Sequence, residues 1–255
     1  MNRTNSRTKN SRTKNRKLII TSILGAITVA LGFTPLGFIP LGILNATTLH
    51  IPVIIGAIVE GPLVGALVGL IFGISSIMRS IMNTTPLTPF IMNPLVSVLP
   101  RVLIGIFAGY TYIWVKKLDE KLLKNLSYIA WIICSVFLGY VLYSNTTNGG
   151  TTMTIILSAI FLVLSLFMLY YTNKKMNSDF AVVASSFIGS MTNTVFFLGM
   201  MYVLYAEQYM VAVGQPVELA RKVIFGIAIT SGIPEAILSV IVTTAVVKGV
   251  LLSKR

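Results

Sequence analysis

The segment "ITSGIPEAILS", residues 229–239, places a carboxylate inside an apolar run that is long enough to cross a bilayer. A charged side chain near the centre of a membrane helix costs about 2.5–3.5 kcal/mol on insertion scales, so Glu235 needs a compensating interaction. One hypothesis makes Glu235 a contact at the edge of a ligand pocket. The alternative is that Glu235 ties helices together by bonding to Arg101 or to backbone amides.

The residues around Glu235 also predict an irregular helix with a polar face. Pro234 has no N–H to donate to the carbonyl of Thr230, and Gly232 lies two residues earlier, so we expect the helix to kink or break here. Polar side chains recur at intervals of four along the same helix. They are Ser231, Glu235, Ser239 and Thr243. One face of this helix is therefore predicted to meet water or polar partners.

A second apolar stretch, residues 180–205, carries a similar small and polar face. Its two series at intervals of four are Ser185, Gly189, Asn193 and Ser186, Ser190, Thr194. Small residues allow backbones to approach closely, and Ser or Thr hydroxyls in membrane helices bond neighbouring backbone, so packing alone is the alternative reading. A buried side-chain amide needs several partners, which makes Asn193 and its neighbour Thr194 candidate binding residues.

The remaining candidates are predicted to lie in the outer half of the membrane. At a rise of 1.5 Å per residue, Arg101 lies about 9 Å and Glu235 about 18–20 Å from the outer end of its helix. His50 lies near the outer end of the second span. The predicted substrate-binding set is Asn45, His50, Arg101, Asn193, Thr194, Ser231 and Glu235. Because a guanidinium holds a carboxylate bidentately, Arg101 suits an anionic ligand.

The side chains that catalysis requires are scarce. The chain has one His, one Cys (Cys134) and isolated acids, which supply neither a metal cluster nor a nucleophile with its base. No GxxxxGK[ST] phosphate loop occurs, so any ATP hydrolysis belongs to partners. We therefore expect no enzyme activity, no cofactor and no metal. An intramembrane enzyme and an ion-coupled carrier remain as alternative functions.

Composition predicts an all-α integral membrane protein. Of 255 residues, 55% are hydrophobic and 11% charged, and the mean hydropathy is +0.85, which leaves too little polar surface for a soluble globule. With about 20 apolar residues as the unit that crosses a bilayer, we predict eight helices. They cover residues 18–33, 44–59, 62–79, 95–115, 126–143, 152–172, 180–205 and 223–247.

Charge predicts the orientation of these helices. Seven of the twenty Lys and Arg lie in residues 1–17, which contain no acid and are predicted to form a disordered cytoplasmic tail near anionic lipid rather than an RNA-binding arm. With the N-terminus inside, the inner segments hold sixteen of the twenty basic residues. Both termini are therefore predicted to be cytoplasmic, with residues 18–255 forming one transmembrane domain.

The predicted spans are of two kinds. Core helices, in residues 18–115 and 180–250, carry proline, glycine and polar side chains, which are tolerated where they face protein or a cavity. The spans within 126–172 look like a peripheral pair that faces lipid. The series Gly65, Gly69, Gly73 predicts close helix packing. The outer loop at residues 34–47, apolar and rich in Pro and Gly, is predicted to be non-helical and to cover a pocket as a lid.

Several of these segments together resemble the substrate-binding subunits, or S components, of energy-coupling-factor (ECF) vitamin transporters. The segments that carry this resemblance are residues 34–76, Pro100-Arg101, "TNTVFFLGMMY" at 192–202 and "TSGIPEAI" at 230–237. Ala26 and Ala30 match the AxxxA pattern by which such subunits meet their transmembrane scaffold. The chain departs from the usual six helices by the inserted pair, and it has Ser231 where the closing motif has Asn.

The resemblance implies a multi-pass subunit in a bacterial cell membrane. It would capture a micronutrient from outside and deliver it inward when docked on a scaffold that two cytoplasmic ATPases drive. In that family the subunit is thought to topple within the membrane. Pantothenate fits the lone Arg101 and the overall resemblance, and cobalamin, queuosine precursors and folate remain open. Internal packing is the alternative role for the face of Ala26 and Ala30.

Overall fold

The fold is a bundle of long helices. The computed structural model describes residues 2–34, 37–40, 45–85, 87–147, 152–175 and 179–252, with only the backbone described for residues 2–13, 38–40, 45, 46, 120, 130, 153, 154, 157, 168, 171–175, 179, 251 and 252. In chain order the elements are α1 (Asn2–Gly32), β1 (Phe38–Pro40), β2 (Asn45–Thr47), α2 (Ile51–Glu60), α3 (Pro62–Met82), α4 (Thr88–Ile91), α5 (Pro94–Ser97), α6 (Leu99–Val115), α7 (Glu120–Thr147), α8 (Thr152–Lys175), α9 (Asp179–Ala212), the 3-10 helix η2 (Val217–Leu219), α10 (Ala220–Ile227), the π-helix η3 (Ala228–Gly232) and α11 (Ile233–Leu252).

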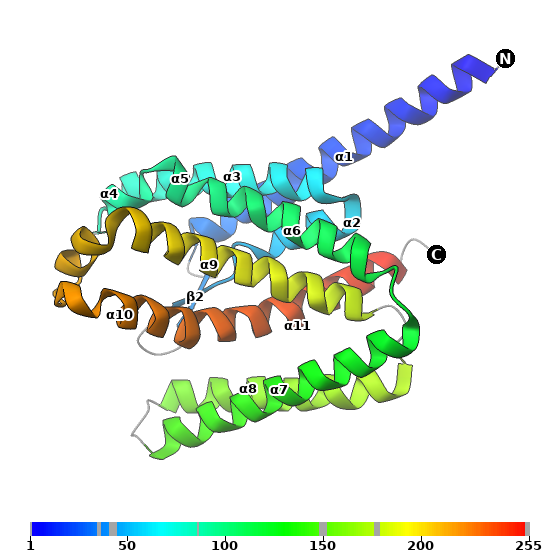
Figure 1. Cartoon of the computed structure of the whole chain (residues 1–255). Helices are drawn as coiled ribbons and strands as arrows, with labels where there is room; N and C mark the ends of the chain where they lie inside the picture. The colour runs from blue at the N-terminus through cyan, green and yellow to red at the C-terminus, as the bar shows by residue number, and fades with distance from the viewer. Residues whose placement is uncertain are drawn as a thin grey trace.

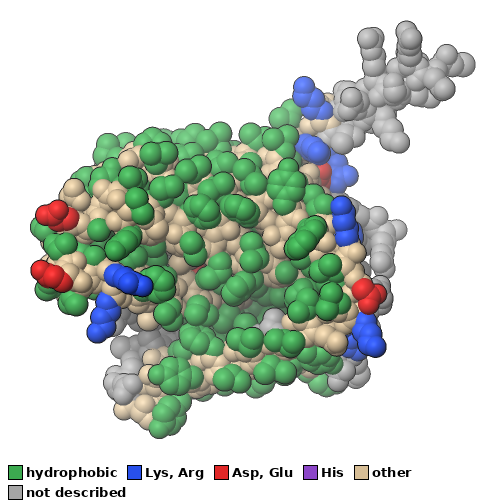
Figure 2. Space-filling model, viewed as in Figure 1, with side chains coloured by type: hydrophobic (Ala, Val, Ile, Leu, Met, Phe, Trp, Pro, Cys, Tyr) green, Lys and Arg blue, Asp and Glu red, His purple; other side chains and the backbone are tan. Residues whose placement is uncertain are grey.

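Length and surface both identify a membrane protein. Within the described residues, six helices are long and apolar enough to cross a membrane, and α2 and part of α8 form shorter apolar helices. Figure 2 shows hydrophobic side chains spread over the sides of the bundle, with charged residues gathered toward its two ends. In Figure 1 the start of α1 and the end of α11 lie toward the same end of the bundle. The side of the membrane on which that end lies stays a prediction.

The second predicted span is corrected by the structure. It was expected over residues 44–59, but α2 begins at Ile51 and has 10 residues, so it is about 15 Å long and cannot cross a bilayer alone. Residues 45–47 instead pair with 38–40 as an antiparallel hairpin, with Phe38 opposite Thr47 and Pro40 opposite Asn45. Pro52 in the first turn fixes where α2 begins, since a proline there loses no helical hydrogen bond.

The C-terminal helix is continuous where a kink or break was expected. The π-helix η3 joins α10 to α11, and Pro234 falls in the first turn of α11. A π-turn contains one more residue than an ordinary helical turn. The helix can therefore accommodate Pro234, which cannot donate a hydrogen bond, and the span is not interrupted. Gly232 in this turn allows α9 to approach, because a Cβ there would lie 2.6 Å from Thr194 Cγ2.

The glycine series of α3 packs against α6, in agreement with the packing prediction. A Cβ on Gly69 would lie 2.1 Å from the backbone oxygen of Arg101, and a Cβ on Gly105 would lie 2.1 Å from the carbonyl carbon of Gly65. Real Cβ atoms do not approach backbone so closely. The backbones of α3 and α6 are therefore in direct contact, and this contact sets the position of Arg101.

We expect Gly69→Ala to destabilise the protein by about 1–3 kcal/mol, the usual range for overpacking a tight contact. The added methyl group would force α3 away from the Arg101 backbone. Gly139→Ala in α7 is the matched control, since a Cβ there would meet nothing within 4 Å. Thermal unfolding of both variants in detergent measures the difference. Equal melting temperatures would contradict the proposed packing.

The inserted pair, α7 and α8, packs beside the core helices α9 and α11 (Figure 1). Leu138 and Phe161 contact Ile237 of α11 in one apolar cluster, and Trp131 contacts Val183 of α9 in another. The hydroxyls of Ser135 and Ser165 join the two helices at 2.9 Å. The outward side chains of the pair are apolar and exposed, as a lipid-facing element requires.

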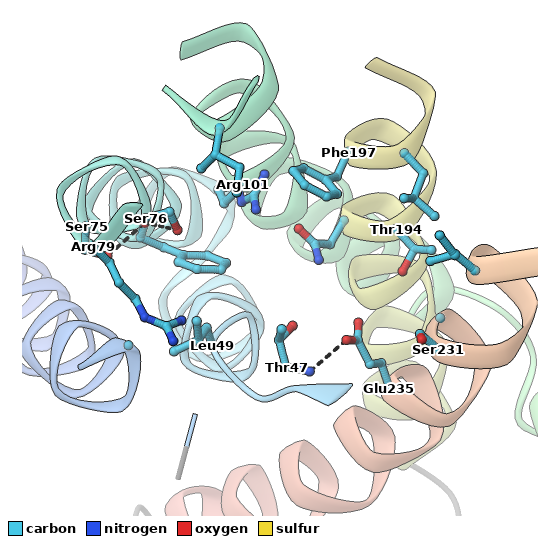
Figure 3. Close-up of a pocket in the computed structure, with 17 residues that line it drawn as sticks. Thr47, Leu49, Ser75, Ser76, Arg79, Arg101, Thr194, Phe197, Ser231 and Glu235 are labelled. Carbon is cyan, nitrogen blue, oxygen red and sulfur yellow. Dashed lines mark hydrogen bonds between the residues drawn. The ribbon is translucent and has the colours of Figure 1, made fainter. Parts of the chain in front are cut away.

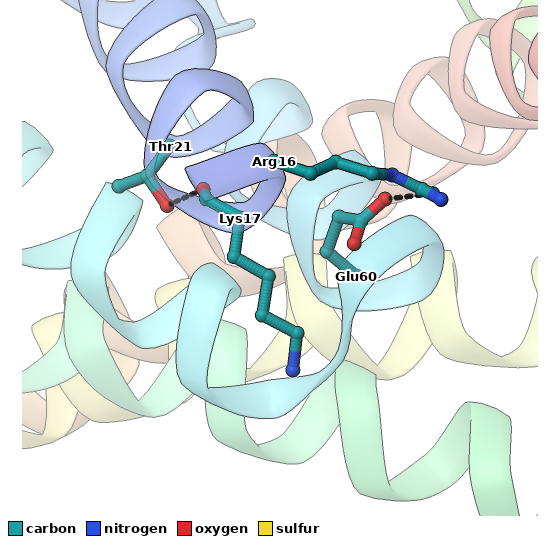
Figure 4. A network of polar contacts seen from close by, with 4 residues as sticks. All are labelled: Arg16, Lys17, Thr21 and Glu60. Atoms are coloured by element: carbon teal, nitrogen blue, oxygen red, sulfur yellow. Dashed lines mark hydrogen bonds and ion pairs between the residues drawn. The ribbon is translucent and has the colours of Figure 1, made fainter. Parts of the chain in front are cut away.

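The N-terminal segment also differs from its prediction. Residues 1–17 were expected to be disordered, whereas α1 begins at Asn2. No Gly or Pro interrupts residues 2–17, so the helix of the first span can extend outward without a break. The Arg16 guanidinium pairs with the carboxylate of Glu60 and ties α1 to the end of α2 (Figure 4). One turn on, Thr21 Oγ1 donates to the Lys17 carbonyl at 2.8 Å.

Candidate functional site

A cavity of about 300 Å³ lies among the core helices and beside the hairpin. Its walls come from α1, β2, α3, α4, α6, α9, α10, η3 and α11. The lining residues are Gly32, Thr47, Leu49, Phe72, Ser75, Ser76, Arg79, Ile91, Arg101, Asn193, Thr194, Phe197, Leu198, Ile227, Ser231, Gly232 and Glu235. Concave sites of this size with a few convergent polar groups bind small molecules.

Arg101 is fixed in the wall of this cavity. Its side chain is buried, with 8% of its surface exposed. Nη1 donates to the Val96 carbonyl at 2.7 Å. The guanidinium carbon lies 4.6 Å from the centre of the Phe197 ring and 5.4 Å from that of Phe72, so aromatic faces stabilise the charge on two sides. Nε is buried without a hydrogen-bond partner among the described residues.

Glu235 holds the hairpin. The backbone N–H of Thr47 in β2 donates to Glu235 Oε1 at 2.7 Å, across 188 positions of sequence (Figure 3). No ion pair within 4 Å joins Glu235 to Arg101 in the described structure. Of the two alternatives for Glu235, the structure therefore contains the backbone-amide bond, and the same carboxylate also lines the cavity. The observed contacts are therefore compatible with both hypotheses for Glu235.

Three more of the predicted site residues line the cavity with polar atoms. Asn193 Oδ1 and Ser231 Oγ are buried without a hydrogen-bond partner in the described part of the chain. Thr194 Oγ1 makes only a long bond of 3.4 Å to the Ser190 carbonyl. Buried polar atoms are normally paired, so unpaired ones at a cavity wall are available to a ligand or to water.

The last two predicted site residues are His50 and Asn45. His50 precedes the first turn of α2 and is fully buried, with neither ring nitrogen bonded to a described residue, and it is not part of the cavity wall. The side chain of Asn45 lies outside the described residues, as do residues 35, 36 and 41–44 of the predicted lid.

The structure adds lining residues that the sequence did not single out. Arg79, in the last turn of α3, contributes a second guanidinium. Phe72 and Phe197 contribute the rings that hold Arg101. One signal was present in the sequence: Phe72, Ser75, Ser76 and Arg79 lie three and four residues apart on one face of α3. The hydroxyls of Ser75 and Ser76 both donate to the Phe72 carbonyl, at 2.9 and 3.0 Å.

The short helices α4 and α5 connect α3 to α6, and Ile91 of α4 lines the cavity. The side-chain oxygen of Asn93 accepts from the Leu95 N–H and starts α5. Its Nδ2 donates to the Tyr205 hydroxyl at 2.8 Å, at the residue where α9 departs from helical geometry. The Phe90 ring lies 5.1 Å from the Tyr205 ring. This wall is therefore anchored to α9, in contrast to the hairpin, whose bond to α11 is through Glu235.

Comparison with known proteins gives one family. A family model described as "ECF transporter, substrate-specific component" matches residues 16–146 and 132–247, which together reach from α1 to α11. No curated protein matches the chain.

Proposed function

Because the chain belongs to the family of ECF transporter substrate-specific components, we propose that it binds pantothenate, or a carboxylate of similar size, in the cavity and delivers it inward. As a member of this family it is a multi-pass protein of the bacterial cell membrane, binds a small-molecule substrate, associates with an energy-coupling module and is not an enzyme. The substrate and the docking surface are the proposed part.

The observation that carries the proposal is a buried guanidinium in a small cavity. Arg101 lines a space of about 300 Å³, the lower end of the range for small-molecule pockets. A cobalamin molecule is far larger than this space. Queuosine precursors carry no carboxylate for a guanidinium to bind, and folate is a larger dianion. Pantothenate is small and has one carboxylate, so size and charge both favour it.

The polar groups of the cavity also suit the rest of the pantothenate molecule. Pantothenate carries a carboxylate at one end, an amide in the middle and two hydroxyls at the other end. Ser231, Asn193 and Glu235 offer hydrogen-bonding atoms for the hydroxyls and the amide. Leu198 and Ile227 offer apolar contact for its two methyl groups. The departure of Ser231 from the family's Asn places a smaller side chain at this contact.

We further propose that the hairpin acts as the lid and that α1 docks on the transmembrane scaffold. Thr47 and Leu49 line the cavity from the hairpin side, and the Glu235 bond fastens the hairpin to α11. Ala26 and Ala30 are exposed on one face of α1 and leave a smooth surface for another helix. Two cytoplasmic ATPases would drive the scaffold.

We expect the purified protein to bind pantothenate with a Kd of about 1 µM or tighter, which corresponds to about −8 kcal/mol. Calorimetric titration with pantothenate, folate, cobalamin and the base queuine measures the preference, and mass spectrometry identifies any ligand retained through purification. Preferential binding of folate, cobalamin or queuine would refute the proposed substrate and leave the family membership untouched.

A further inference from the structure

His50 is fully enclosed next to Leu49, a residue of the cavity wall, and we infer that it is a positioning residue for the binding site. Its ring accepts a hydrogen bond from the Nε–H of Arg101 and donates one to Asn193 Oδ1, so that the Asn193 amide turns its NH2 group toward the ligand. This role rests on the proposed function, in which the cavity is the substrate site. It belongs to the one histidine of the chain, which contributes no surface to the cavity itself.

The contact between α2 and α9 puts His50 opposite Asn193. A Cβ on Gly189 of α9 would lie 2.8 Å from Ile54 Cγ1 of α2, so these two residues are neighbours across the contact. His50, whose φ and ψ are helical, precedes Ile54 by four residues, which is one turn on the same face of α2. Asn193 follows Gly189 by four residues, which is one turn on the same face of α9. Both turns lead toward the cavity, because Leu49 and Asn193 line it.

Helix α6 brings Arg101 to the same junction. The Cβ position at Gly189 also lies 3.1 Å from Ala108 Cβ of α6. Arg101 precedes Ala108 by seven residues, or two helical turns, so its side chain starts from the face of α6 that meets α2 and α9. Nη1 is held by the Val96 carbonyl at 2.7 Å, whereas the Nε–H is enclosed and still needs an acceptor.

The hydrogen-bonding needs of these three side chains complement one another. The enclosed atoms that have no partner among the described residues are Arg101 Nε, both ring nitrogens of His50 and Asn193 Oδ1. An arginine Nε–H only donates, an amide oxygen only accepts, and a neutral imidazole does one of each. Among these three side chains, only the order Arg101, His50, Asn193 pairs all four atoms, directly or through an enclosed water.

This order fixes which groups the cavity offers to a ligand. With Oδ1 bonded to the His50 ring, the Asn193 amide presents two N–H groups to the cavity that it lines. Arg101 lines the cavity as well and keeps Nη2 for the anionic group of the ligand. Both residues then act as donors, so the ligand must bring acceptor oxygens to this side of the cavity. The carboxylate and the amide carbonyl of pantothenate are such acceptors.

The single histidine allows a test that needs no ligand. Protein whose histidine ring carries an NMR-active nitrogen isotope, purified in detergent, should give the two ring signals of one neutral tautomer, with the N–H proton protected from exchange. Asn193→Ala should shift the signal of the protonated nitrogen and expose its proton to exchange. Asn193→Asp keeps an acceptor oxygen and should keep the proton protected. Thr244→Val removes an enclosed, unpaired hydroxyl outside the cavity wall and is the control, with unchanged ring signals.

A second test measures whether His50 acts on the ligand through Asn193. Calorimetric titration uses pantothenate, or folate, cobalamin or queuine if the protein binds one of these in its place. His50→Leu should weaken binding about 10-fold, and His50→Gln, whose amide both donates and accepts, should restore most of the affinity. In an Asn193→Ala background, His50→Leu should change the affinity less than about twofold, because residues that act as a unit are not additive. A histidine that only stabilises the fold would have additive effects on affinity.

The outcomes keep the role of His50 apart from the proposed substrate. Binding of folate, cobalamin or queuine instead of pantothenate refutes the proposed substrate, and both tests still decide the role of His50. If the subunit binds none of the four compounds, or if His50→Leu does not fold, the ring signals decide alone, since they need no substitution at His50. Ring signals that do not respond to Asn193→Ala, additive losses of affinity in the double variant, or full affinity in His50→Leu would overturn the inference.

Discussion

Replacing Glu235 by Gln is expected to weaken ligand binding by roughly 1.5–3 kcal/mol, the range for a hydrogen bond to a charged group. The amide keeps the shape of the carboxylate but removes the charge that holds the Thr47 N–H at 2.7 Å. The hairpin would then spend less time closed over the cavity. A protein that occupies its binding-competent form for a smaller fraction of the time has a proportionally weaker apparent affinity.

Three measurements on this variant distinguish a lid fastener from a helix brace. Calorimetry gives the affinity, thermolysin cleavage within residues 34–47 reports opening of the hairpin, and a melting curve gives the stability. We expect ligand to protect the wild-type hairpin and to protect the Glu235→Gln hairpin less. Glu207→Gln, on the exposed surface of α9, controls for loss of a carboxylate elsewhere. A lowered melting temperature with unchanged affinity and unchanged cleavage would mean that Glu235 only braces helices.

The double substitution Ala26→Trp and Ala30→Trp is expected to abolish uptake and to leave ligand binding by the solitary subunit near normal. Both alanines are exposed on α1, and among the described residues of that helix Gly32 alone lines the cavity. Two indole rings on this face would hold a partner helix away from the α1 backbone, because close helix contact in membranes depends on small side chains. The cavity would keep its shape.

Uptake of labelled substrate by cells that contain the complete transporter measures this effect, and calorimetry on the purified subunit measures binding. A matched control places two tryptophans on the lipid-facing surface of α7, at Ile133 and Val136, which are 62% and 69% exposed. That control should transport normally. Normal uptake by the α1 variant would remove Ala26 and Ala30 from the docking surface.

The spacing of polar residues predicted five of the residues that line the cavity because helical geometry is regular. Intervals of four on two helices marked Asn193, Thr194, Ser231 and Glu235, and depth along the helix placed Arg101 at the same level. All five line one cavity in the structure. Arg79 was missed because a basic residue at the end of a span is ordinary on the outer side of a membrane, and its position over the cavity depends on how α3 packs against α6.

The irregular elements were harder to predict, since local sequence does not determine their contacts. The sequence placed residues 44–59 in one span because the strongly apolar residues of α2 outweigh the polar side chains of residues 45–50 in such a window. The pairing of β1 with β2, and the bond that fastens β2 to Glu235, join positions far apart in sequence. Pro234 correctly indicated an irregular helix. Both a break and a π-turn accommodate a residue that has no N–H, and the packing of α9 against Gly232 distinguishes between them.

The short helix α2 has a consequence for the permeability of the membrane. It occupies the half of the bundle next to Glu60, with Val53 and Ile54 fully enclosed by neighbouring helices. A solute or ion that leaked from the cavity toward Glu60 would have to displace this apolar helix of ten residues. The free energy needed to remove water from an ion and move it past such apolar side chains is prohibitively large. The solitary subunit should therefore hold its ligand without dissipating ion gradients. Under the proposed function, release on the inner side would then require movement of the whole subunit and not the opening of a pore.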